Sequence, residues 1–250
     1  METMAATLHI RSRTMPGYAS YRRRGGEFEI LGRHFDPAYE FLHRHIPNDK
    51  FLVYNATKGV LKIQEQDTNA NSLVLSIGGI CQNPGTPRAR AAWGVYFGPG
   101  SPYNASALLD PALPQTRTRA EMEALRQALG IIKAKIISGD YRPRRCIIKT
   151  HSSYIGRVFP SPVHGRAAEK AVYFELLMEI RQRLGDIGYV DGVERGTDVR
   201  FWCVQQGKNQ EADGLAVDAL ARSRDGHEEG RGWKLFASKY VGWLASMWPT

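Results

Sequence analysis

Five short motifs hold most of the side chains whose types and spacing could do chemistry. Two of them place a carboxylate, Glu121 or Asp213, near the start of an apolar helical pattern. A third places His151 directly after an apolar run. Carboxylate oxygens bind hard divalent cations, and arginine, which is frequent in this chain, suits phosphate groups. The motifs are 78–85 (GGICQNPG), 93–104 (WGVYFGPGSPYN), 115–124 (QTRTRAEMEA), 150–154 (THSSY) and 209–216 (NQEADGLA).

The charge of the 250-residue chain favours a polyanionic partner, because 34 Lys and Arg face 25 Asp and Glu, a formal charge of +9. The three cysteines lack the spacing of a metal site, which indicates reduced thiols. No apolar run approaches the roughly 20 residues of a membrane helix, and none opens the chain as a signal segment. We therefore expect an intracellular protein with no membrane partner, in the nucleus or cytoplasm rather than the mitochondrion.

The apolar pattern predicts a compact α/β unit after a polar linker at 64–71. Apolar spacings of three and four predict helices at about 118–136, 166–184 and 209–221, the first with a capping box of Thr118 and Glu121. Three strands, then helix, strand, helix, strand and helix, indicate a mixed sheet with helices packed against it. The runs that predict these strands are 73–77, 91–97, 105–109, 146–150 and 199–204.

This order of elements, together with the motifs, resembles the type 1 ribonuclease H family over about residues 72–221. Motif 115–124 is similar to the QTNxRAExxA signature that opens the family's first helix, and motif 209–216 to the NxxADxLA that opens its last. The resemblance implies an α/β fold with a ribonuclease H-like mixed five-stranded sheet, three antiparallel strands followed by parallel additions, flanked by helices. We accordingly divide the chain into a disordered basic arm (1–26), an extension and linker (27–70), a ribonuclease H-like domain (71–221) and a C-terminal amphipathic helix (222–250).

The same resemblance implies a metal site from which two ligands are missing. Members of the family hydrolyse the RNA strand of an RNA/DNA hybrid with four carboxylates that hold two Mg²⁺ about 4 Å apart. Two of the carboxylates correspond to Glu121 and Asp213, but Gly78 and His151 occupy the other two positions, and Gln206 replaces a loop histidine. We therefore expect no cofactor, with Mg²⁺ or Mn²⁺ bound only if residual activity exists. An alternative stays open, in which Glu121, Asp213 and His151 hold one softer ion such as Mn²⁺ or Zn²⁺.

A second set of residues is expected to contact nucleic acid. Arg117 replaces an amide side chain that in the family reaches the minor groove of the hybrid, and arginine favours phosphate contacts over base-edge or sugar hydrogen bonds. We expect affinity to persist while discrimination for hybrids weakens. The alternative is that Arg119 caps the helix and that Arg88 and Arg90 are solvated loop residues. The full set is Asn83, Arg88, Arg90, Gln115, Arg117 and Arg119.

The last segment of the sequence predicts an amphipathic aromatic helix, because Trp233, Phe236, Tyr240, Trp243 and Met247 recur at spacings of three and four. We expect it to pack on the domain or on residues 28–62. The alternative is a docking helix for a partner protein, since exposed aromatic residues anchor interfaces.

The sequence thus predicts a ribonuclease H-like protein that binds nucleic acid, an RNA/DNA hybrid or structured (double-stranded) RNA, and has lost catalysis. One alternative is an active, metal-dependent RNA/DNA hybrid endonuclease. Another is a protein-interaction scaffold, in which the face that corresponds to the family's active site and the C-terminal helix bind a partner protein. In each case we expect Glu121 and Asp213 to lie together at one end of the sheet, with Gly78 and His151 as their neighbours.

Overall fold

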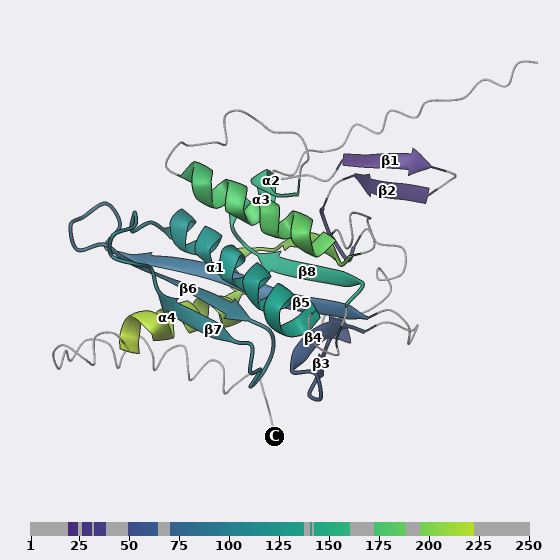
Figure 1. Ribbon diagram of the computed structural model, residues 1–250, viewed down its shortest axis with the longest axis horizontal. Coiled ribbons are helices and arrows are strands. Elements are labelled where there is room, and N and C mark those ends of the chain that lie inside the picture. The colour runs from purple at the N-terminus through teal and green to yellow at the C-terminus, as the bar shows by residue number, and fades with distance from the viewer. Residues whose placement is uncertain are drawn as a thin grey trace, which may run out of the picture.

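A mixed sheet of seven strands forms the centre of the described chain, and helices cover both of its faces (Figure 1). Its strands are β3 (Leu52–Asn55), β4 (Val60–Ile63), β5 (Ser72–Gln82), β6 (Arg90–Tyr96), β7 (Ala105–Leu108), β8 (Arg145–Thr150) and β9 (Asp198–Cys203). The helices are α1 (Arg117–Ile131), α2 (Ser153–Val158), α3 (Phe174–Gly188) and α4 (Gln210–Arg222). The computed structural model describes residues 20–24, 27–31, 33–38, 50–64, 71–137, 141, 143–160, 173–188 and 196–222.

Strand β5 is the organising strand of the sheet. It pairs antiparallel with β6 and β4 and parallel with β8, which in turn pairs parallel with β9. Val74 is opposite both Leu61 of β4 and Ile147 of β8, so β4 lies along the same edge of β5 as β6. The ribonuclease H-like mixed sheet is confirmed. The expected number of five strands is wrong, because the hairpin β3–β4 extends the sheet from within the segment 27–70.

The two faces of β5 alternate as a pleated strand requires. Leu73, Leu75 and Ile77 belong to the large core under α1 and α3, whereas Val74 faces a second cluster that contains Phe35 and Phe51. Residues 78 and 79 continue this alternation as glycines. A Cβ on Gly79 would lie 2.5 Å from the backbone nitrogen of Glu121 in α1, and one on Gly78 would overlap Asp213 of α4. The glycine pair therefore lets α1 and α4 approach the sheet from opposite faces.

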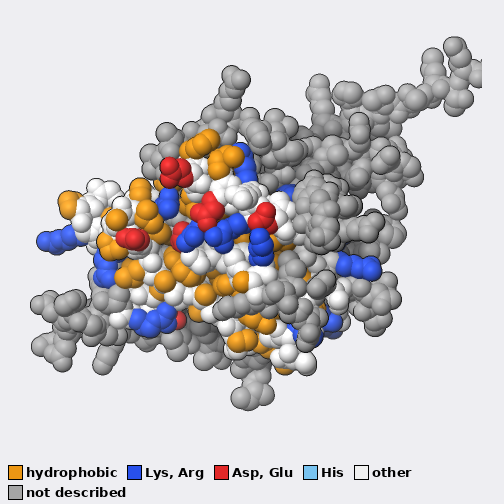
Figure 2. Space-filling view, viewed as in Figure 1, with side chains coloured by type: hydrophobic (Ala, Val, Ile, Leu, Met, Phe, Trp, Pro, Cys, Tyr) orange, Lys and Arg blue, Asp and Glu red, His pale blue; other side chains and the backbone are white. Residues whose placement is uncertain are grey.

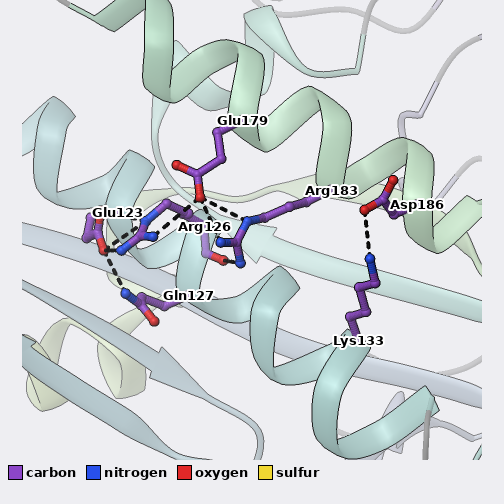
Figure 3. Close-up of polar contacts among 7 residues, drawn as sticks. All are labelled: Glu123, Arg126, Gln127, Lys133, Glu179, Arg183 and Asp186. Atoms are coloured by element: carbon purple, nitrogen blue, oxygen red, sulfur yellow. Dashed lines mark hydrogen bonds and ion pairs between the residues drawn. The ribbon is translucent and has the colours of Figure 1, made fainter.

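Ion pairs join α1 to α3 on the outer side of the large core (Figure 3). Arg126 bridges the two helices, with contacts of 2.5 Å to Glu123 and 3.4 Å to Glu179. Arg183 binds the same Glu179 at 2.7 Å, and Lys133 binds Asp186 at 2.7 Å. Of these pairs, Arg126–Glu179 links α3 to α1, and Lys133–Asp186 links α3 to the π-helical segment Ile132–Ile137 that follows α1.

The ends of the elements differ from the sequence prediction in several places. Thr116, not Thr118, caps α1, because its side chain accepts a hydrogen bond from the backbone nitrogen of Arg119 at 3.1 Å. The short helix α2 was not predicted. The first part of the helix expected at 166–184 lies outside the described residues, and its remainder, α3, runs on to Gly188.

Both terminal segments lie largely outside the described residues. Within the segment expected to be a basic arm, β1 (Ser20–Arg24) pairs antiparallel with β2 (Glu27–Leu31). The predicted helix at 222–250 lies, beyond Arg222, outside the described residues. Among the helices that are described, none is long and apolar enough to cross a membrane.

Candidate functional site

The four positions of the expected site come together where β8 ends beside β5. The last parallel pair between these strands joins Ser76 to Lys149, so His151 emerges opposite Gly78 where β8 leaves the sheet. Glu121 approaches from the first turns of α1 and Asp213 from the first turn of α4, on the other face. His151 lies just after the end of β8, and its ring is close to Glu121 of α1 and to Asp213 of α4.

The ring of His151 stands between the two carboxylates. Its Nε2 is 4.0 Å from Oε1 of Glu121, and its Nδ1 is 3.7 Å from Oδ2 of Asp213. The Asn209 amide nitrogen, 3.1 Å from Nδ1, and the Arg117 guanidinium, in contact with Nε2, are both N–H donors. Burial, with the nearby charge of Arg117, lowers the pKa of His151 to about 4. The imidazole is therefore neutral at pH 7 and forms no ion pair with either carboxylate.

Both oxygens of Glu121 accept hydrogen bonds. Oε1 accepts from Nε of Arg117 at 3.0 Å, and Oε2 accepts from the hydroxyl of Ser152 at 2.6 Å. Burial raises the pKa of Glu121, against the opposing effects of the Ser152 hydrogen bond and of Arg117. The carboxylate is held in one orientation by partners from α1 and from the turn before α2.

Asp213 lacks such partners. Its Oδ1 is buried without a hydrogen-bond partner and lies in the space above Gly78. Burial raises the pKa of Asp213 to about 7; Arg117 lowers it, and the negative charges of Glu121 and Glu211 raise it further. A buried carboxylate oxygen without a donor is costly. The group is consequently only partly ionised at neutral pH.

The cluster of Glu121, Asp213 and His151 does not fit the two divalent ions bound by the ribonuclease H family that the sequence resembles. Two carboxylates provide at most two negative charges, and hard cations need several oxygen ligands. Glu121 and Asp213 lie near opposite ring nitrogens of His151. In the described part of the chain, no group of three or more His, Cys, Asp or Glu side chains is placed to hold a metal ion. The binding of one softer ion by Glu121, Asp213 and His151 stays a prediction.

The six side chains expected to contact nucleic acid do not form one surface. Gln115 is occupied within the fold, since its Oε1 accepts from the backbone of Ala91 at 2.9 Å and its amide donates to two carbonyls of the preceding loop. Arg119 turns away from the carboxylates and lines a cleft of about 960 Å³ between α1, α3 and β7, beside Trp93 and Phe174. The contact of Arg119 with nucleic acid stays a prediction.

The remaining expected contacts lie in the turn after β5. Asn83 adopts a positive φ of 49° and opens this turn, in which Gly85 also has a positive φ. Arg88 is exposed, and Arg90 begins β6 opposite Gln82. Asn83 and Arg88 therefore lie in the loop between β5 and β6, and Arg90 lies at its end, on the first residue of β6.

Three residues of the site were missed by sequence reasoning. Ser152 binds Glu121 and also caps α2 through the backbone nitrogen of Ile155. Asn209 is fully buried; its amide nitrogen donates to the carbonyl of Ile77 and lies 3.1 Å from Nδ1 of His151. Lys149 is buried and lies 3.8 Å from Glu211. Ser152 and Asn209 stand inside motifs 150–154 and 209–216, so polar residues of those motifs were the available signal.

Comparison with known proteins gives sequence relatives in one family. The chain is 28% identical over 166 residues to mouse (Mus musculus) Ribonuclease H1, a match that covers 62% of this chain and 52% of that protein. It is 43% identical over 67 residues to rat (Rattus norvegicus) Ribonuclease H1, covering 27% of this chain and 23% of that protein. The matches thus span about half or less of the curated relatives. No protein family profile matches the chain.

Solved structures give the same comparison at lower identity. LC11-RNase H1 in complex with an RNA/DNA hybrid has a TM-score of 0.44 and 20% identity, with 60% of this chain and 97% of that chain covered. RNase H1 from Halobacterium salinarum has a TM-score of 0.42 and 18% identity, with 60% and 98% covered. Over part of its length the chain is thus similar in sequence to type 1 ribonuclease H proteins, and its mixed sheet with flanking helices is ribonuclease H-like.

Proposed function

We propose that the protein binds nucleic acid, an RNA/DNA hybrid or structured RNA, through its ribonuclease H-like domain without cleaving it. The observation that carries this proposal is the carboxylate cluster, in which Glu121 and Asp213 keep their places while Gly78 and His151 provide no negative charge. Two-metal hydrolysis relies on anionic ligands that balance two divalent ions. A site with half of these charges lacks the reaction machinery.

The distribution of charge supports phosphate contacts at one part of the surface. The face that carries α1 and α3 mixes acidic and basic side chains at its centre (Figure 2), so it does not offer a uniformly positive surface to a phosphate backbone. Arg88, by contrast, is exposed in the turn after β5, and Arg117 is 44% exposed at the start of α1. We assign the phosphate contacts to this turn and to the N-terminus of α1.

The test is binding of a fluorescently labelled RNA/DNA hybrid, with double-stranded RNA and double-stranded DNA alongside, over a range of salt concentrations. Phosphate contacts release counterions, so the logarithm of the affinity is expected to fall linearly with the logarithm of the salt concentration. Binding should not require Mg²⁺ and should persist in EDTA. An affinity that does not respond to salt, or no binding at low salt, would contradict the proposal and favour the protein scaffold.

A matched pair of variants locates the contact. Arg88→Gln should weaken binding to all three nucleic acids and reduce the salt slope by about one unit, as expected for the loss of one phosphate contact. Arg222→Gln removes the same charge at the far end of α4, where Arg222 donates to Ser106 at 2.9 Å. It should leave the slope unchanged.

The names of the curated relatives favour one competing function, an active RNA/DNA hybrid ribonuclease. The binding experiment in Mg²⁺ distinguishes it, because the same samples can be analysed for cleaved RNA. Cleavage that requires Mg²⁺ and is lost in Asp213→Asn would establish the competing function and refute the proposed one.

A further inference from the structure

We propose that the guanidinium of Arg117 is the resident cation of the cluster formed by Glu121, His151 and Asp213, and that it excludes divalent cations from this cluster. The inference concerns metal binding by this chain and does not depend on whether the protein binds nucleic acid. It gives Arg117 a role different from the phosphate contact considered above, since the same group neutralises the site that it borders.

The contacts of Arg117 place its charge inside the cluster. Its Nε donates to Oε1 of Glu121 at 3.0 Å, and one of its terminal nitrogens contacts Nε2 of His151. The other ring nitrogen of His151 is 3.7 Å from Oδ2 of Asp213. One guanidinium therefore links α1 to the turn after β8 and sits on the side of the ring where an ion held by Glu121 would have to be.

Helix physics alone does not explain an arginine at this position. Arg117 is the first residue of α1, where a positive charge is disfavoured by the helix dipole. Its pair with Glu121 has the cation four residues before the anion, the weaker of the two orientations on a helix. The contacts that favour Arg117 are thus those with the buried Glu121 carboxylate and with His151 from another element.

The same contacts obstruct a divalent ion. Both oxygens of Glu121 are occupied, one by Arg117 and the other by Ser152. An ion that ligated Glu121 would have to displace one of these donors and would stand a few ångströms from a fixed positive charge. In a partly buried site this repulsion is strong, because screening by water is reduced.

The direct test is isothermal titration of Mn²⁺ into the full chain and two variants. Wild type should bind Mn²⁺ weakly, and Arg117→Gln should bind it at least about tenfold more tightly, because a unit charge close to the ion has been removed. The control is Arg157→Gln, which removes an exposed arginine of the neighbouring α2 whose Nε donates to the carbonyl of Ser153. It should bind as weakly as wild type.

Two results would overturn the proposal: wild type and Arg117→Gln with equal Mn²⁺ affinity, or an equal gain in Arg157→Gln. A second measurement covers the case in which Arg117→Gln does not fold. Paramagnetic Mn²⁺ added to the wild-type protein should leave the ring signals of His151 sharp in NMR spectra. Selective broadening of those signals at low Mn²⁺ would show that the cluster of the native protein admits the ion, and the proposal would be wrong.

Discussion

The carboxylate of Asp213 lies directly over Gly78, in the space that a side chain at position 78 would need. A Cβ there would overlap Oδ1 of Asp213 and lie 3.1 Å from its backbone nitrogen. Because a buried side chain must shift to make room, Gly78→Ala is expected to destabilise the protein by about 1–3 kcal/mol. Urea unfolding of Gly78→Ala in the wild-type and Asp213→Ala backgrounds measures this, and the cost should be smaller when Asp213 has been truncated.

Two other glycines provide the controls for this prediction. At Gly79 the obstructing atom is backbone of α1, so Gly79→Ala should cost more than Gly78→Ala and should not be rescued by Asp213→Ala. A Cβ on Gly214, within α4, would meet no atom within 4 Å, and Gly214→Ala should stabilise the helix by roughly 0.5–1 kcal/mol. Equal costs at positions 78 and 79 in both backgrounds would contradict the steric account.

Asp213 is expected to make the protein less stable as the pH rises. Its pKa is about 7 in the folded protein, against an ordinary value of 3.8. A group that binds its proton more tightly when folded contributes stability that is fully present below its unfolded pKa and is lost as the pH rises through its folded pKa. Asp213→Asn should therefore raise stability at pH 8 by on the order of 1–3 kcal/mol. At pH 4 the gain should largely vanish in urea unfolding midpoints.

His151 should act in the opposite direction. Its pKa is lowered from 6.5 to about 4, so its contribution to stability is present above pH 6.5 and is lost as the pH falls through about 4. His151→Gln should flatten the loss of stability over that window, whereas Asp213→Asn should steepen it. Chemical denaturation of both variants between pH 4 and 8 compares the two slopes. Parallel pH profiles for wild type and His151→Gln would show that the ring is not buried as described.

Much of the fold could be predicted because its signals are local. The apolar runs around Leu75 and Ile148 and the apolar spacing from Met122 to Ile132 predict buried strands and a helix by periodicity alone. The hairpin β3–β4 was missed as part of the sheet, which it joins by backbone pairing: Leu61 is opposite Val74 of β5, and its backbone nitrogen donates to the carbonyl of Phe97, just after β6, at 2.7 Å. Backbone pairing leaves no pattern of side chains in the sequence.

The candidate site, like the fold, could be predicted from the sequence only in part. The proximity of Glu121, Asp213, Gly78 and His151 follows once the motifs are placed on the ribonuclease H-like topology. The orientation of Arg117 toward Glu121 cannot be predicted from the motifs, because an arginine at the start of a helix can equally well extend into solvent and be free to contact phosphate. Only the positions of Glu121 and His151 in three dimensions show which groups its guanidinium meets.

The final prediction is that the wild-type protein does not cleave an RNA/DNA hybrid in Mg²⁺ and that cleavage can be rebuilt in stages. Glu121 and Asp213 give a charge of at most about −2, where a site for two divalent ions has about −4. The double substitution Gly78→Asp and His151→Asp restores the missing carboxylates, and neither change alone should suffice. Even the double variant should be slow, because Asp213 must turn away from position 78 and Arg117 still occupies Glu121.

Adding Arg117→Gln to the double substitution should therefore increase the rate of hybrid cleavage, whereas adding Arg157→Gln should not. Single-turnover cleavage of an end-labelled hybrid compares these variants, with Asp213→Asn introduced into the triple variant as the inactive control. The residue Gln206, in place of the family's loop histidine, is expected to keep turnover slow in all of them. If the triple variant is no faster than the double variant, Arg117 is not what limits metal binding. If the wild-type protein already cleaves the hybrid in Mg²⁺, the incomplete carboxylate set is sufficient for catalysis, and the assignment of a non-catalytic site is wrong.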